Sequence, residues 1–112
     1  MSGSFELKKG DSGKFMFNLK SGNSQVILTS QTYASKESAL AGIESVKTNS
    51  ADDTRFERKV SSAEQPYFVL IASNGQTIGK SQMYSAPAAM ENGIESVKSN
   101  APDASVVDNS DA

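Results

Sequence analysis

The chain repeats itself at a constant offset of 51 residues, and the two copies align without any insertion. The hexapeptide Gly-Ile-Glu-Ser-Val-Lys begins at Gly42 and again at Gly93. Phe17 recurs as Phe68 at the same offset. A six-residue identity inside a chain of 112 residues is far beyond chance, so the sequence contains an internal duplication.

Two copies are too few for a solenoid, which needs at least three stacked units. Each copy alone has about 50 residues, a size at which a hydrophobic core is marginal. We therefore expect one pseudo-twofold domain over residues 1–108, with repeat 1 at about 5–57 and repeat 2 at about 56–108. Because one chain supplies both halves, a monomer is the expected state. The polar residues 109–112 are expected to form a disordered tail.

Each copy carries the same succession of secondary-structure patterns. In the first copy, short strands are predicted at 5–8, 14–20 and 26–29, because alternation of side chains is typical of a strand. A helix is predicted to follow. Ser35 suits its N-cap, and apolar residues then recur at spacings of three and four. Asn49 suits a left-handed cap after the last turn.

The segment 54–60 corresponds by offset to two parts of the repeat. It matches the opening strand at 5–8 and also the closing strand at 105–108. We expect one strand to serve both copies and to join the halves into one sheet. The predicted fold is therefore α+β: tandem β-β-β-α-β repeats form one mainly antiparallel sheet of about seven or eight strands, with two helices packed on one face.

The motifs resemble a known family. A hairpin with Gly22-Asn23 or Asn74-Gly75 is followed in each copy by Ile-x-x-Ser-Gln-x-Tyr, then by a helix ending in Gly-Ile-Glu-Ser-Val-Lys-x-Asn. This order resembles the YegP-like family of small bacterial tandem-repeat proteins of unknown function, over nearly the whole chain. The resemblance implies exchanged C-terminal strands and helices on one face of a single sheet. It implies no catalytic or binding residues.

Several positions raise questions of packing. Gly79 stands where copy one has Leu28, and Glu91 stands where copy one has Leu40. Glycine in the middle of a helix costs about 1 kcal/mol relative to alanine, and the duplication repeats such a glycine. We expect a close approach of each helix to the sheet or of the two helices to each other; a ligand crevice is the alternative. The tyrosines before the helices, Tyr33 and Tyr84, are expected to pack at the helix entrances and to hydrogen-bond through their hydroxyls, with ligand binding as the alternative.

The composition excludes several chemistries. The sequence has no histidine and no cysteine, which removes the commonest general base, the usual zinc ligands and any disulfide. No glycine-rich phosphate-binding motif is present. We therefore expect no enzyme activity and no cofactor or metal.

Charge and hydropathy bear on partners and location. A formal net charge of −2 argues against a broad nucleic-acid footprint, which needs an excess of basic residues. No segment reaches the roughly 20 apolar residues of a membrane-spanning helix, and no signal-peptide pattern occurs at the N-terminus. We expect a cytoplasmic location without membrane contact.

Glu44 and Glu95 are the best candidates for an enzymatic role. They occupy equivalent helix positions and could form a twofold-related carboxylate pair that acts as general acid and base, or that holds a cation. Lys47 and Lys98 follow three residues later, so two surface ion pairs are the simpler explanation. A carboxylate-dependent enzyme is thus an alternative function.

One strand face differs between the copies. On the face opposite Phe68, copy two carries Tyr67, Val69 and Ile71. The equivalent residues of copy one are more polar: Met16, Asn18 and Lys20. If helices cover only the other face, the three apolar side chains form an exposed patch, and the partner expected there is a protein. A covering loop or a curled sheet is the competing explanation.

Single-stranded nucleic acid is a further alternative. Phe15 and Phe17 alternate between Lys14 and Lys20, an arrangement that superficially suits base stacking. Their equivalence with the core-facing positions of copy two favours burial instead. The function we expect is a small, non-catalytic, cytosolic binding or interaction module, whose partner the sequence does not name.

Overall fold

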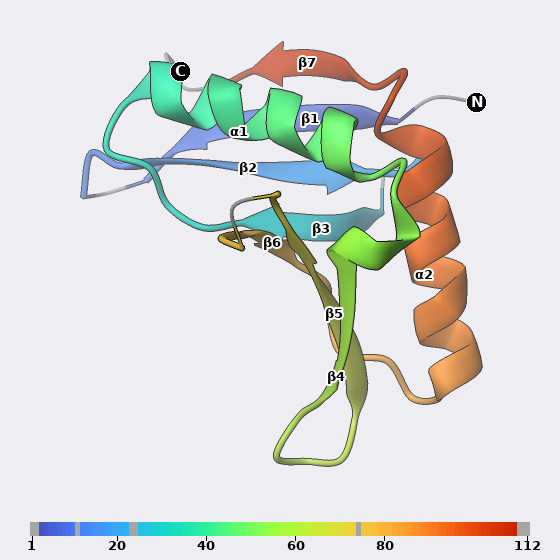
Figure 1. The fold of residues 1–112 in the computed structure, drawn as a ribbon. Coiled ribbons are helices and arrows are strands. Elements are labelled where there is room, and N and C mark those ends of the chain that lie inside the picture. Colours follow the sequence, from blue (N-terminus) through green and yellow to red (C-terminus); the bar gives the residue numbers. More distant parts are fainter. Residues whose placement is uncertain (1–2, 11, 23–24, 74, 110–112) are drawn as a thin grey trace.

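The computed structural model describes residues 3–10, 12–22, 25–73 and 75–109. Within them the chain forms seven strands, two α-helices and one turn of 3₁₀-helix at Asp53–Arg55 (Figure 1). In chain order the elements are β1 (Ser4–Lys9), β2 (Phe15–Lys20), β3 (Val26–Ser30), α1 (Lys36–Asn49), β4 (Phe56–Val60), β5 (Pro66–Ile71), β6 (Thr77–Lys80), α2 (Pro87–Asn100) and β7 (Ser105–Asp108).

All seven strands belong to one sheet in the order β4-β5-β6-β3-β2-β1-β7. The pairings are antiparallel except for β7, which runs parallel to β1. The sheet twists strongly, so that β4 and β5 run crosswise to β1 and β2 (Figure 1). The predicted α+β fold with a mainly antiparallel sheet is confirmed.

The two copies meet at the β3–β6 pairing. Thr29 lies directly opposite Lys80, which is its own counterpart in the second copy, and Ser30 lies opposite Gly79. An antiparallel pair in which a residue faces its own equivalent places a pseudo-twofold axis at that point. The axis therefore passes through the sheet beside Thr29 and Lys80.

One hydrophobic core fills the space between the sheet and the helices. Phe17 and Leu19 of β2, with their counterparts Phe68 and Leu70 of β5, are fully buried in it. Helix α1 contacts β2 of its own copy and also β5 and β6 of the other, while α2 contacts β5 and β3. Because each helix spans both copies, neither half encloses a core of its own.

The helix ends agree with the sequence in part. Ser35 caps α1 as predicted, since its hydroxyl accepts a hydrogen bond of 3.1 Å from the Ser38 amide. The left-handed cap expected at Asn49 is wrong. Asn49 is the last helical residue, and its side-chain amide donates to the Ser45 carbonyl at 2.8 Å, so the chain continues through Ser50 in a right-handed conformation.

The shared strand does not join the halves. β4 pairs with β5 as the opening strand of copy two and lies at one edge of the sheet, whereas β3 and β6 make the junction. The closing strand of copy two, β7, crosses to pair with β1 of copy one, as the family resemblance implied. In copy one, residues 54–57 are the equivalents of β7, and they lead directly into β4. They therefore cannot form a second strand that pairs with β4.

The last described residue, Asn109, lies one position beyond the expected domain end at residue 108. The Asn109 amide donates to the Leu7 carbonyl at 2.8 Å, so this first residue of the expected tail is held against β1. Residues 110–112, and the turn residues Asn23 and Asn74, lie outside the described part of the chain. Within the part that is described, neither helix has the length and apolar character needed to cross a membrane.

Candidate functional site

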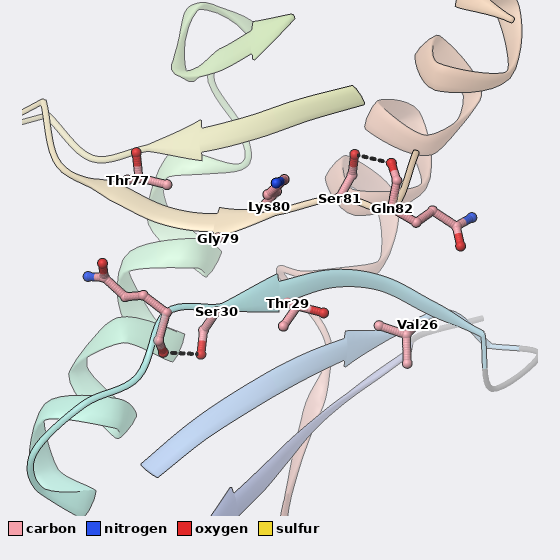
Figure 2. Close-up of a pocket in the computed structure, with 9 residues that line it drawn as sticks. Val26, Thr29, Ser30, Thr77, Gly79, Lys80, Ser81 and Gln82 are labelled. Carbon is pink, nitrogen blue, oxygen red and sulfur yellow. Dashed lines mark hydrogen bonds between the residues drawn. The ribbon is translucent and has the colours of Figure 1, made fainter. Parts of the chain in front are cut away.

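A cavity of about 450 Å³ lies on the pseudo-twofold axis (Figure 2). It opens where β3 and β6 diverge after their short pairing. Its lining comes from both copies: Val26, Thr29, Ser30, Gln31, Thr77, Gly79, Lys80, Ser81 and Gln82. Eight of these nine residues form equivalent pairs at the repeat offset, so the duplication itself builds the cavity.

The cavity belongs to the face of the sheet that carries no helix, which we call the helix-free face. Residues directly opposed on neighbouring strands share a face. Register pairs therefore run across the helix-free face in one row, which contains Glu6, Asn18, Thr29, Lys80, Val69 and Glu57. Thr29 and Lys80 are the two members of this row that line the cavity.

The copies differ where the axis passes. A Cβ atom at Gly79 would lie 2.9 Å from Cδ2 of Leu28, so the leucine of copy one occupies the space of its counterpart. Beside this pair, Lys80 faces a threonine and not a second lysine. Two like charges directly opposed across strands would repel. The Leu28/Gly79 difference thus avoids a steric overlap between equivalent side chains, and the Thr29/Lys80 difference avoids repulsion between two equivalent charges.

Among the described residues that line the cavity, Lys80 alone is ionisable. Its amine lies over the Tyr67 ring, 4.9 Å from the ring centroid. None of the ion pairs among the described residues includes Lys80. The cavity therefore has a cation at its rim without a carboxylate partner from the described chain.

Two buried serines anchor the ends of β3 and β6. The Ser30 hydroxyl accepts a hydrogen bond of 2.9 Å from the Phe17 amide, and donates to the Gln31 carbonyl at 2.7 Å. Ser81 repeats this arrangement with Phe68 and Gln82, at 3.0 and 2.8 Å. Figure 2 shows the two serine–glutamine bonds on opposite sides of the cavity. These bonds fix the backbone at both ends of the site.

Two smaller grooves lie on the helix side and are also equivalent. One, of about 310 Å³, is bordered by Tyr84 and Gly93, and the other, of about 270 Å³, by Tyr33 and Gly42. Each glycine leaves space for a tyrosine ring to pack against the helix. A Cβ at Gly42 would lie 2.8 Å from Cζ of Tyr33. The close approach of helix to sheet expected at these glycines is also found, since a Cβ at Gly42 would lie 3.1 Å from Cε2 of Phe17 in β2.

The tyrosine hydroxyls are partly withdrawn from water in these grooves. Burial raises the pKa of Tyr33, although a hydrogen bond from the Gln31 side chain opposes the rise. The pKa of Tyr84 is raised by burial in the same way, with Gln82 opposing it. Each ring stacks on a core phenylalanine, with ring planes 12° apart in both copies. Both tyrosines therefore pack at the edge of the hydrophobic core.

Comparison with known proteins identifies the family. The family model described as "Domain of unknown function (DUF1508)" matches residues 11–57 and matches again over 61–108. This chain belongs to the DUF1508 family. A UPF0339 protein of Bordetella pertussis is 51% identical over 112 residues, which is 100% of both chains. The UPF0339 protein YegP of Yersinia pestis is 49% identical over 88% of each chain.

A solved structure supports the same assignment. The solution NMR structure of yegP from E. coli, described as a protein of unknown function, has a TM-score of 0.95 and 47% identity. The match covers 100% of this chain and 97% of that one. The resemblance to YegP and the tandem duplication are therefore confirmed. The family description names no catalytic activity.

Within this DUF1508 chain the two helix glutamates are not brought into any of the three cavities. Glu44 and Glu95 have side chains that are 72% and 71% exposed, and they pair with Lys47 and Lys98 at 3.8 and 3.3 Å. The described residues contain no group of three or more metal-ligating side chains. The geometry therefore offers no support for the carboxylate-enzyme alternative.

The predicted patch residues lie on the helix-free face next to the cavity. Val69 is only 7% exposed, because its row neighbours flank it, while Tyr67 and Ile71 are partly exposed. The full exposure expected for Val69 is thus not observed. The role of Tyr67, Val69 and Ile71 in binding stays a prediction.

The aromatic stacking surface expected for nucleic acid is not available. Phe17 is fully buried, and Phe15 packs against the core with Lys9 over its ring at 5.7 Å. The alternative of single-stranded nucleic-acid binding therefore has no support from the structure.

A charged cluster beside β4 was not predicted from the sequence. Arg58 donates two hydrogen bonds to Glu91, at 2.6 and 2.9 Å, and Lys98 donates to Asp53 at 2.6 Å. The Arg58 guanidinium lowers the pKa of Glu91, and Lys98 lowers that of Asp53. Arg58 has Leu7 as its counterpart and Glu91 has Leu40, so copy two has an ion pair where copy one has two leucines. The cluster therefore joins the edge strand β4 to helix α2.

Proposed function

We propose that this DUF1508 protein is a non-catalytic binding module, and that the helix-free face around the axial cavity is its binding surface. One observation carries the proposal: the cavity is the largest of the three, and it lies at the junction of the two copies. A volume of about 450 Å³ falls within the range of small-molecule sites, roughly 300–1,000 Å³.

The chemistry of the lining favours binding over catalysis. Hydroxyls, two amides and one amine surround the cavity, together with apolar surface from Val26 and the buried Gly79. No carboxylate is found in the lining that the structure describes, and the sequence has neither histidine nor cysteine. This set of groups can orient a ligand through hydrogen bonds but contains no pair suited to general acid–base catalysis.

The protein partner expected from the sequence is part of the same proposal. Tyr67 and Ile71 are partly exposed beside the cavity, so a partner protein would bind over this face. We also propose that the protein is a monomer in the cytoplasm. Light scattering should give a mass near 11.9 kDa, and a mass near twice that value would contradict the monomer.

The proposal is tested by mapping where small molecules bind. A set of neutral, cationic and anionic aromatic fragments is added to ¹⁵N-labelled protein, and amide shifts are followed by NMR. We expect the largest shifts at Thr29, Gly79 and Ser81, which line the cavity. Shifts confined to the grooves beside Tyr33 and Tyr84, or no shifts from any fragment, would contradict it.

A further inference from the structure

We propose that the axial cavity binds a small organic anion, with a carboxylate held by Lys80 and an apolar body lying between β3 and β6. The inference rests on the proposed function and names its ligand class. The first support is the charge of the site. Of the lining residues that the structure describes, Lys80 alone carries a charge, and none of the described ion pairs includes it.

The second support is the pairing of the nearby carboxylates. The Glu6 carboxylate, on the same face, forms ion pairs with the amines of Lys20 at 3.0 Å and Lys8 at 3.4 Å. Glu57, at the other end of the row, pairs with Lys59 at 2.9 Å. The acidic residues of the row are therefore engaged by other lysines, and the positive charge of Lys80 is left to attract an anion.

The third support is the position of the charge on the axis. The counterpart of Lys80 is Thr29, which lies directly opposite it, so the residue pair at the axis supplies one amine and one hydroxyl. A carboxylate has two oxygens and can accept from both groups, since the amine donates and so does the hydroxyl. A neutral or cationic ligand would leave the amine without this charge-assisted contact.

The fourth support is the apolar surface next to the charge. Val26 and Thr77 are equivalent residues at opposite ends of the cavity, and Gly79 lines it between them (Figure 2). An apolar body can lie on this surface while its carboxylate reaches Lys80. Inorganic anions lack such a body, so an organic acid fits the site better than phosphate does.

The test compares 2-naphthoate with its neutral isostere 2-naphthamide by NMR titration of the full chain. We expect naphthoate to shift Thr29 and Gly79 amides and to bind about fivefold more tightly than naphthamide, the effect of one partly screened ionic contact. Lys80→Gln should abolish this preference, and Lys80→Arg should retain it. Lys9→Gln is the matched control, because Lys9 also lies over an aromatic ring but does not line the cavity.

The outcomes separate the two proposals. Equal binding of naphthoate and naphthamide in the cavity, or an unchanged preference in Lys80→Gln, overturns the anion inference and leaves the binding module intact. Tighter binding of inorganic phosphate than of naphthoate also overturns it. Cavity amides that do not shift with either naphthyl compound contradict both proposals. Spectral dispersion like that of the wild type confirms that each variant is folded.

Discussion

Leu28 of β3 fills the space that its own counterpart, Gly79 of β6, leaves open. A Cβ atom at Gly79 would lie 2.9 Å from both Cγ and Cδ2 of Leu28, closer than normal van der Waals contact. The two positions adjoin the pseudo-twofold axis, where equivalent side chains meet each other. The core therefore has room for one leucine at this point, and either copy could in principle supply it.

This relationship predicts the outcome of a swap. Leu28→Gly should remove a fully buried side chain and lower the free energy of unfolding by about 2–5 kcal/mol. Gly79→Ala should cost about 1–3 kcal/mol by overpacking. The double variant Leu28→Gly/Gly79→Leu should regain a large part of the loss, as measured by urea denaturation. A double variant less stable than Leu28→Gly alone would show that the positions are not interchangeable.

The helix glycines predict a reversal of ordinary helix propensity. In a helix without close neighbours, replacing a glycine by alanine raises the free energy of unfolding by about 1 kcal/mol. In Gly42→Ala the new methyl group would lie 2.8 Å from Cζ of Tyr33, so we expect a net loss of about 1–3 kcal/mol in the free energy of unfolding.

A double-mutant cycle tests the named contact. Combining Gly42→Ala with Tyr33→Phe should reduce the cost of the alanine, because the phenol oxygen is removed. Ala41→Gly, one position earlier on the exposed side of α1, is the matched control and should follow helix propensity. Additive effects of Gly42→Ala and Tyr33→Phe would refute the proposed steric cause.

The two anchoring serines predict equal and independent losses. Ser30→Ala leaves the buried Phe17 amide without its acceptor, and Ser81→Ala does the same to the Phe68 amide. Each should cost about 1–3 kcal/mol, the penalty of an unpaired buried donor. Denaturation of the single and double variants measures this. Exposed Ser99→Ala should change little, and a negligible effect of both buried substitutions would refute the anchoring role.

The Arg58–Glu91 pair predicts an acid-dependent contribution to stability. Arg58 lowers the pKa of Glu91 from its ordinary value of 4.5 in the folded state. The unfolded chain thus binds the proton first, so the stabilisation is present above the ordinary pKa and is lost as pH falls through the folded-state pKa.

A pH series of urea denaturations measures this effect. Because the pair is solvent-exposed and screened, we expect a loss of no more than about 1 kcal/mol, which Glu91→Gln should remove. Glu44→Gln, whose partner Lys47 is 3.8 Å away, is the control. An identical pH dependence in Glu91→Gln and wild type would exclude the pair as its source.

The repeat and the strand alternation predicted most of the fold. Offset alignment and side-chain periodicity are local signals, and they identified the strands, the Ser35 cap and the core positions Phe17 and Phe68. The junction of the copies was not predictable in this way. The segment 54–60 matches two strands, and only three-dimensional closure decides that β3 and β6 pair at the centre.

The axial cavity was missed although the sequence held a signal for it. Leu28 and Thr29 are adjacent, and both change in the second copy, to Gly79 and Lys80. Near a twofold axis, a residue meets its own equivalent, so bulk or charge must differ between the copies there. The copies also differ at every position from 34–41 to 85–92, so the Leu28 and Thr29 departures identify the axis only once the pairing of β3 with β6 is known.

Residue-resolved unfolding tests the central claim that the two copies share one core about this axis. Amide signals of Leu19 in β2 and Leu70 in β5 are followed by NMR through a urea titration, since both residues are fully buried in equivalent positions. We predict the same midpoint for both amides, because each helix contacts strands of both copies. Separate midpoints for Leu19 and Leu70 would show two independent units and would contradict the account.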